Sequence, residues 1–220
     1  GQNGPYSTRA GYDYIIQGMS GLMSITGEPG GRPLKTGVAI TDIFTGLYAS
    51  SAILAALHQR KETGHGQHID MSLLDSAVAI LANQGMNYLS TREAPGRIGN
   101  FHPNLSPYQV FECSDGHIII ATGNDQQYQN LCDILQCPEQ ATDPKYETNA
   151  KRVENRYELD EVLSHKTKKW KKAKLLKQCE ANGIPAGPIN SLDEVFADQQ
   201  IIHRGMELSF EGIPSVRSPI

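Results

Sequence analysis

Apolar residues in the first 90 positions recur mostly at the spacing of helices. Residues 11–24, GYDYIIQGMSGLMS, predict a helix, and EPGGRPLKTG after them predicts a loop because Gly and Pro interrupt regular structure. Asp42 then opens an apolar segment that meets no breaker after Gly46 until the polar turn KETGHGQ. This segment predicts a mostly buried helix of about five turns. HIDMSLL alternates enough to predict a strand, and Ser72 or Asp75 is expected to cap the next helix, DSAVAILANQGMNYLS.

Strand patterns open the second half of the chain. Between Ser90 and Pro107 the pattern breaks into Gly, Pro and Asn, as at a crossing between domains. YQVFEC and HIIIAT then predict a hairpin, since the SDG between them favours a turn. The other expected elements are a helix capped by Asn124 or Asp125 that runs to about Leu135, helices at 152–164 and 167–182, an extended IPAGPIN, and a short helix at 192–197. The fold class is therefore expected to be α/β, a helical part followed by a small α+β unit.

Composition narrows the function classes. The 220 residues are 39% apolar and carry a net charge of −4, so no overall basic field favours nucleic acid or an anionic membrane surface. No uninterrupted apolar run of about 18 residues is evident, so a membrane span is not expected, and the polar start GQNGPYSTRAG does not resemble a signal peptide. The four cysteines are too scattered for a disulfide framework or a zinc site, which favours free thiols in a reducing, cytoplasmic setting.

Asp42 is the residue with the most interesting chemistry, and two interpretations of it are open. It can be a structural N-cap, whose oxygen accepts backbone N–H bonds at the positive end of the helix dipole. It can also be a nucleophile. Burial raises the pKa of an aspartate from its usual value of about 3.9, while amides and the dipole lower it, so a dry carboxylate at a helix start can stay ionised.

Other candidate sites have simpler explanations. His58, His65 and His68 lie at a helix end, in a turn and at a strand start, and no carboxylate at a matching step completes a metal site. The lysine-rich stretch at 166–177 is expected to be an amphipathic helix with Trp170, Ala173 and Leu176 on its apolar stripe. Gly123-Asn124-Asp125 can approach a ligand or simply cap a helix.

A long stretch of the chain resembles the core of the class III CoA-transferases, the family of formyl-CoA and carnitine CoA-transferases. The stretch is AGYDYIIQGMSGLMSITGEPGGRPLKTGVAITDIFTGLYASSAILAALHQRKETGHGQHIDMSLLD. Its signature is an Asp between a small-apolar run and a TG-containing helix, followed by K-x-TG-x-G-Q and S-L-L-D. Downstream, GNFHPNLSPYQVF, DGHIIIATGNDQQY, TNAKRVENRYEL and GIPAGPIN match the smaller domain in order.

The resemblance implies a covalent mechanism at Asp42. Its carboxylate is expected to attack an acyl-CoA thioester, and CoA then passes through an aspartyl thioester to an acceptor acid. CoA esters are thus substrates, and no permanently bound cofactor or metal is implied. Tyr12 and Asp13 match a Tyr-Glu pair lining the formyl-CoA transferase pocket, and His102, with Arg9 and Arg97, is a candidate for binding a distal carboxylate.

The chain is most similar to the dicarboxylate-using, succinyl-CoA:glutarate branch, and it looks like the central portion of a family fold. The family's α-methylacyl-CoA racemases have a His where this chain has Tyr12, which favours transferase over racemase. A non-catalytic dimerisation scaffold is the other alternative. The resemblance implies a homodimer and four parts: residues 1–95 of the large domain with the nucleophile, a linker at 96–106, a small α+β domain at 107–204, and a return segment at 205–220.

Overall fold

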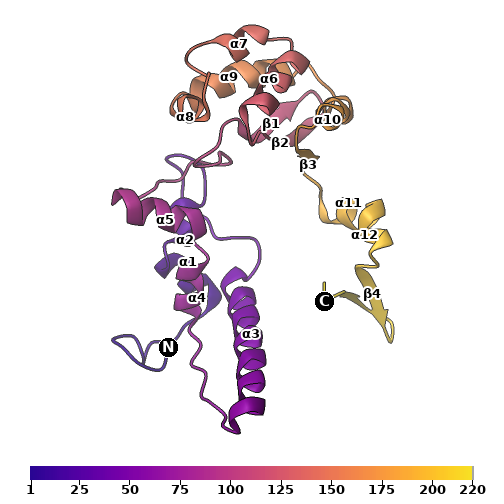
Figure 1. Ribbon diagram of the computed structural model, residues 1–220. Coiled ribbons are helices and arrows are strands. Elements are labelled where there is room, and N and C mark those ends of the chain that lie inside the picture. Colours follow the sequence, from indigo (N-terminus) through magenta and orange to yellow (C-terminus); the bar gives the residue numbers. More distant parts are fainter. Residues whose placement is uncertain (220) are drawn as a thin grey trace. The chain divides into compact units, whose positions relative to one another are not determined.

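The computed structural model describes residues 1–219 and divides into two compact units, Gly1–Pro103 and Asn104–Ile220 (Figure 1). The boundary between them lies at residues 103 and 104, in the stretch rich in Gly, Pro and Asn. The four-part division expected from the family resemblance stays a prediction.

The first unit is helical throughout its regular structure. Its helices are α1 (Asp13–Met19), α2 (Leu22–Ile25), α3 (Ile40–Thr63), α4 (Leu73–Ala79) and α5 (Ala82–Thr91). Two long helices of the sequence prediction are each split. Gly21, at φ 91°, separates α1 from α2, and Ala82, at φ 47°, marks the bend between α4 and α5. A positive φ interrupts a right-handed helix wherever it falls, and the apolar spacing that continues across the break gives no warning of it.

The prediction of a strand at HIDMSLL is wrong. Residues 65–72 have no regular structure, and no strand occurs within residues 1–103, all of which are described. The segment alternates in sequence, but a strand needs a neighbouring strand for its backbone hydrogen bonds, and this unit offers none. The predicted cap is confirmed for Ser72, whose Oγ accepts the Asp75 N–H at 3.3 Å and starts α4.

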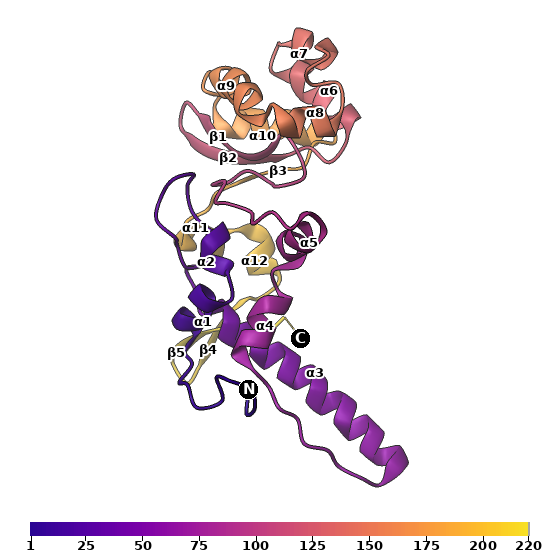
Figure 2. The ribbon, with the colours of Figure 1, turned by 90° about the vertical axis from the view of Figure 1, so that its left-hand side faces the viewer.

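Helix α3 is longer and much more exposed than the sequence predicts. It has 24 residues, about seven turns, and ends where Gly64 takes the left-handed conformation and its N–H bonds to Arg60 O at 2.9 Å. Thr41 is its one buried residue, so the expectation of a mostly buried helix is wrong for this chain. Its outer half extends away from α1 and α4 (Figure 2), where the described residues of this unit offer nothing to pack against.

By length and composition α3 also meets the requirement for a membrane-spanning helix. Its most apolar 18-residue window has a mean hydropathy of 1.5, and 6% of that window is buried. The segment has no uninterrupted apolar run, because Gly, Ser and Thr are interspersed among Leu, Ile and Ala, so it does not stand out in the sequence. One such helix is weak evidence, because core helices meet the same requirement.

The second unit combines a sheet with several helices. Its helices are α6 (Asp125–Ile134), α7 (Pro138–Thr142), α8 (Asn149–Glu154), α9 (Arg156–Thr167), α10 (Lys172–Ala181), α11 (Leu192–Ala197) and α12 (Gln199–His203). Its strands are β1 (Tyr108–Cys113), β2 (Gly116–Ala121), β3 (Ala186–Pro188), β4 (Glu207–Phe210) and β5 (Ile213–Val216). β1, β2 and β3 form an antiparallel sheet in that order, and β4 pairs with β5.

The core of this unit lies between the β1–β2–β3 sheet and the helices on one of its faces (Figure 2). Alternate residues of the two long strands point into it, including Phe111 and Ile120, which are both fully buried. The hairpin predicted from YQVFEC and HIIIAT is confirmed, with Cys113 opposite Gly116 across the turn. The short helix at 192–197 is confirmed as well.

The lysine-rich stretch is not the single helix predicted for it. α9 ends at Thr167 and α10 begins at Lys172, so Trp170 lies in the connection, where it is half-buried against the core. The connection is fixed by one backbone bond and one bond to a side chain: Trp170 O accepts the Ser114 N–H at 2.9 Å, and the carboxylate oxygen Oδ1 of Asp115 accepts the Lys172 N–H at 2.8 Å. Both bonds join this connection to the turn between β1 and β2, which is more than 50 residues away in the sequence.

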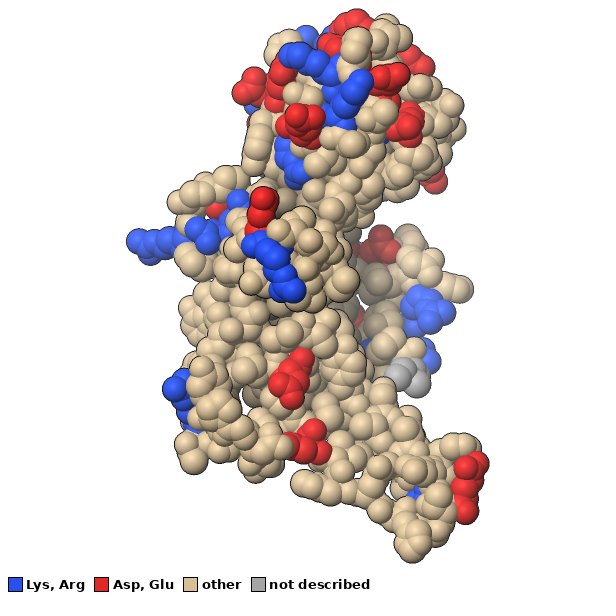
Figure 3. Space-filling view, turned by 60° about the vertical axis from the view of Figure 1, so that its left-hand side comes forward, with Lys and Arg blue, Asp and Glu red and all other residues tan. Residues whose placement is uncertain are grey.

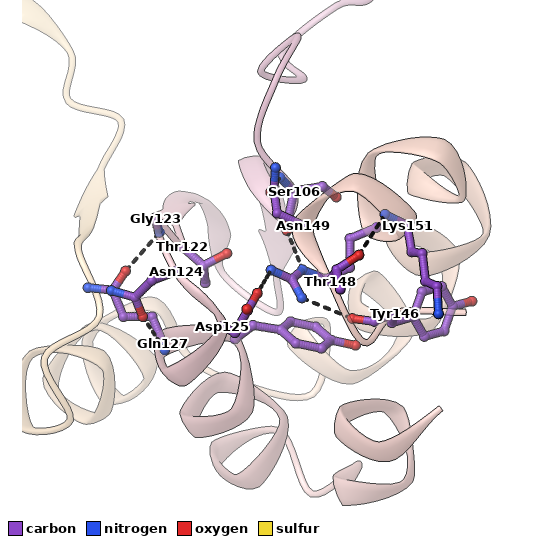
Figure 4. A network of polar contacts seen from close by, with 12 residues as sticks. Ser106, Thr122, Gly123, Asn124, Asp125, Gln127, Tyr146, Thr148, Asn149 and Lys151 are labelled. Carbon is purple, nitrogen blue, oxygen red and sulfur yellow. Dashed lines mark hydrogen bonds and ion pairs between the residues drawn. The ribbon is translucent and has the colours of Figure 1, made fainter. Parts of the chain in front are cut away.

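A buried arginine links three segments of the second unit (Figure 4). The Arg152 side chain is 1% exposed and donates to Ser106 O at 2.8 Å, Tyr146 O at 2.9 Å and Asp125 Oδ1 at 2.6 Å. Its guanidinium also lies 4.4 Å from the centre of the Tyr128 ring. The network therefore fixes the segment before β1, the start of α6 and the loop before α8 relative to one another.

The start of α6 confirms the cap predicted at Asn124. The side chain of Asn124 accepts the Gln127 N–H at 2.9 Å, and the side chain of Gln127 in turn accepts the Gly123 N–H at 2.7 Å (Figure 4). Together with the Asp125–Arg152 ion pair, these bonds give the polar groups of Gly123-Asn124-Asp125 a structural role in starting α6, without a ligand.

Candidate active site

Asp42 occupies the first turn of α3, but it is not the N-cap that the sequence argument proposed. The helix begins at Ile40 with Ala39 as N-cap, so Asp42 is the third helical residue. Asp42 is exposed, and Thr41 beside it is fully buried. The N-cap interpretation is therefore wrong, because the helix starts earlier and takes its capping group from elsewhere in the chain.

The capping group of α3 is the carboxylate of Asp13, at the start of α1. Its Oδ1 accepts both the Thr41 N–H at 2.9 Å and the Thr41 hydroxyl at 2.7 Å, across 28 residues of sequence. The first N–H groups of a helix have no partner within the helix, so an outside carboxylate there satisfies a donor and meets the positive end of the dipole. A tertiary contact thus replaces the local cap.

The second oxygen of Asp13 is held as firmly as the first. Asp13 Oδ2 accepts from the side-chain N–H of Gln17 at 2.8 Å, and the side-chain oxygen Oε1 of Gln17 accepts the Thr36 N–H at 3.0 Å. Gln17 is fully buried. We call Thr36, Gln17, Asp13 and Thr41 the Asp13 clamp, because its bonds hold both ends of the short segment that leads into Asp42.

These bonds change the acidity of Asp13. Burial raises its pKa, but hydrogen bonds from the Thr41 hydroxyl and N–H, and from Gln17, outweigh that effect and hold the pKa below the ordinary value of 3.8. The backbone N–H of Asp42 acts in the same direction. Asp13 is therefore a carboxylate at neutral pH, and its charge lies at the N-terminal end of α3.

The other residues singled out from the sequence are spread over the first unit. Tyr12 is the residue before α1 and is 73% exposed, directly beside Asp13. Arg97 donates to Gly31 O at 2.7 Å and to Ser24 O at 3.5 Å, so it binds the loop before α3 to the end of the unit. Arg9 stacks on Tyr6 at 4.0 Å, and His102 is half-buried near the end of the unit. The contacts of Arg9 and Arg97 given above are made with residues other than Asp42.

Neither the charged residues nor the potential metal ligands among residues 1–219 form a second candidate site. Among residues 1–219 no group of three or more His, Cys, Asp and Glu side chains could hold a metal ion. In Figure 3 basic and acidic residues are interspersed over the helices of the second unit, at the top of the view, and the visible face of the first unit is mostly uncharged. The four cysteines are unpaired and buried.

Sequence reasoning missed Thr41 and Gln17. Gln17 follows Asp13 by four residues, which on a helix places the two side chains next to each other, so this spacing was a usable signal. The contact of Asp13 with Thr41 has no local signal, because it depends on how α1 packs against α3.

A model of CoA-transferase family III matches residues 1–216. The chain belongs to CoA-transferase family III. This chain is 54% identical to a succinate–glutarate CoA-transferase of Agrobacterium fabrum, and the alignment covers all of this chain and 56% of that relative. It is 47% identical to a mouse succinyl-CoA:glutarate CoA-transferase, covering all of this chain and 51% of that relative.

Solved structures agree with the family assignment. A CaiB/BaiF family protein from Brucella suis is 51% identical and superimposes with a TM-score of 0.85, with all of this chain and 58% of that chain covered. The resemblance predicted from the motifs and the partial α/β fold of class III proteins are thereby confirmed. The CoA-transferase segment spans about half the length of the curated relatives it matches.

Proposed function

We propose that this chain is the nucleophile-bearing part of a CoA-transferase that moves CoA from an acyl-CoA to a carboxylic acid, with a dicarboxylate such as succinate or glutarate as substrate. The observation that carries the proposal is the exposed carboxylate of Asp42 in the first turn of α3, in a chain of family III. The names of the A. fabrum and mouse relatives supply the substrate class.

The proposed chemistry uses Asp42 as a covalent nucleophile. Its carboxylate oxygen attacks the thioester carbon, the C–S bond breaks, and CoA leaves as a thiolate, so that Asp42 and the donor acyl group form a mixed anhydride. The thiolate then attacks the aspartyl carbon, which releases the donor acid and leaves Asp42 as a CoA thioester. An acceptor carboxylate repeats the sequence in reverse, and Asp42 is regenerated when CoA attacks the new acyl group. Each step exchanges one acyl bond for another, so no oxidant or metal is needed for balance.

Several finer features belong to the same proposal. Tyr12 and His102 are proposed to contact the substrate, since Tyr12 is exposed beside the start of the clamp. The complete protein is proposed to be a cytoplasmic homodimer that takes CoA esters as substrates and holds no permanent cofactor. The family assignment supports the use of CoA esters.

Mass spectrometry tests the nucleophile directly. The complete polypeptide that carries this sequence is incubated with succinyl-CoA, quenched with hydroxylamine and digested. We expect a hydroxamate on the peptide containing Asp42, lost on addition of glutarate before the quench. Asp42→Asn removes the adduct. Asp75→Asn is the matched control, because Asp75 is also exposed in the first turn of a helix.

Three results would contradict parts of the proposed function. A hydroxamate on another peptide, or full exchange activity in Asp42→Asn, refutes the assignment of Asp42. Absence of any binding of CoA esters to the complete polypeptide favours the scaffold alternative. Adducts from acetyl-CoA as abundant as those from succinyl-CoA contradict the dicarboxylate preference.

A further inference from the structure

We propose that Asp13 is a positioning residue for Asp42: it caps α3 in place of Asp42 and leaves the carboxylate of Asp42 free for attack. The inference rests on the proposed function of Asp42. It replaces a substrate contact, the role that family resemblance suggested for Asp13, with a role inside the protein.

The bonding of Asp13 leaves little capacity for a substrate. Oδ1 accepts two bonds from Thr41, and Oδ2 accepts one from Gln17, at 2.7 to 2.9 Å. A carboxylate also repels the carboxylate of a dicarboxylate substrate. Asp13 is thus well suited to hold protein donors and poorly suited to bind the acid.

The position of Asp42 explains why an outside cap matters. An acidic residue at the third helical position can turn back to accept N–H groups at the helix start, as in a capping box. In α3 the Thr41 N–H already belongs to Asp13, and the N-cap residue Ala39 has no capping side chain. Among residues 1–219 the carboxylate of Asp42 accepts no hydrogen bond and is exposed, so its oxygens are not drawn back toward the backbone while Asp13 provides the cap.

The clamp also fixes the backbone from which Asp42 projects. Thr36 and Thr41 are both bound to the α1 side chains Gln17 and Asp13, so the turn between them is held at each end. Gln17 and Thr41 are fully buried, which shields these bonds from water. Thr41 O further accepts the Thr45 hydroxyl at 2.6 Å, which extends the constraint into the second turn of α3.

Single-turnover acylation of Asp42 by succinyl-CoA tests the inference in the complete polypeptide. Asp13→Asn keeps the size of the side chain but cannot accept from both Thr41 and Gln17. Thr41→Val removes the hydroxyl donor, and Thr41→Ser restores it. We expect Asp13→Asn and Thr41→Val each to slow acylation by about 10- to 100-fold, because small misplacements of a reacting group cost this much. We expect Thr41→Ser to stay close to the unsubstituted rate.

The effect on substrate affinity separates positioning from substrate contact. A positioning role leaves the KM for succinyl-CoA and for glutarate nearly unchanged while the acylation rate falls. A rise in the KM for glutarate with an unchanged acylation rate overturns the inference in favour of a substrate contact. Equal acylation rates in all variants overturn it as well. Circular dichroism of each variant, together with the rescue by Thr41→Ser, distinguishes misplacement from unfolding.

The outcomes for the two proposals are distinct. If the unsubstituted protein forms no adduct on Asp42, the proposed function fails. If the unsubstituted protein and Asp75→Asn are acylated equally and the clamp variants match them, the positioning role alone fails.

Discussion

Replacement of Arg152 by Met is expected to destabilise the second unit more than any change to an exposed charge. Methionine has a similar length but no donor. The substitution leaves Ser106 O and Tyr146 O without their partner, in residues that are 3% and 1% exposed. It also removes the ion pair with Asp125 and the contact with the Tyr128 ring.

The expected loss can be estimated from these contacts. A buried acceptor left unsatisfied costs about 1–3 kcal/mol, so the two carbonyls contribute about 2–6 kcal/mol. The Asp125 side chain is 58% exposed, so water replaces the lost ion pair at little cost. Methionine recovers part of the ring contact through its sulfur. We therefore expect the free energy of unfolding to fall by about 3–5 kcal/mol, most of it from the two unsatisfied carbonyls.

Urea unfolding followed by circular dichroism measures this loss. The matched control is Lys151→Met, which also replaces a basic residue of α8 by methionine, but at a position where both partners of the ion pair with Glu147 are exposed. The control is expected to cost about 0.5 kcal/mol or less. If Arg152→Met unfolds within about 1 kcal/mol of Lys151→Met, the buried network contributes far less than its geometry implies, and the argument from unsatisfied carbonyls is refuted.

Three further predictions concern caps, packing and pH. Ser72→Ala is expected to lower the free energy of unfolding by about 1 kcal/mol, and Ser72→Asp to recover most of it, as measured by urea titration. Leu131→Ala, at a fully buried position in the core of the second unit, is expected to lower the free energy of unfolding by about 2–5 kcal/mol. A loss smaller than that of Ser72→Ala would contradict the packing. The folded pKa of Asp13 lies below 3.8, so its stabilising contribution is present above that pH and is lost as the pH falls through the folded pKa. If the urea concentration at the unfolding midpoint is measured at a series of acidic pH values, Asp13→Asn is accordingly expected to make it depend less on pH.

Elements with their own local signals were predictable from the sequence. The turn SDG, the cap at Asn124 and the cap at Ser72 each depend on residues within a few positions of one another, and all three are confirmed. Two failures depend on distant partners. HIDMSLL has strand alternation but no strand to pair with, and the lysine-rich stretch is broken at Trp170 by bonds to the hairpin turn.

The burial of α3 failed for a related reason. Its apolar composition predicts a helix that is covered on most sides, and a helix does form there, although it is longer than predicted. Burial, however, is a property of what packs around a helix. Composition sets the need for a covering surface, and the described residues of the first unit supply one only near Thr41.

The candidate site combines both kinds of outcome. Asp42 was singled out from motif and position, because an acid at the start of an apolar helix stands out in the sequence, and its role as nucleophile stays a prediction. Its cap was assigned to the wrong carboxylate, since only residues near Asp42 were considered and Asp13 lies 28 residues before its partner Thr41. A cap from another helix makes the start of α3 depend on the packing of α1. The same contact that completes the first unit therefore also sets the orientation of the proposed nucleophile, so substitutions in α1 are expected to affect acylation without touching the substrate.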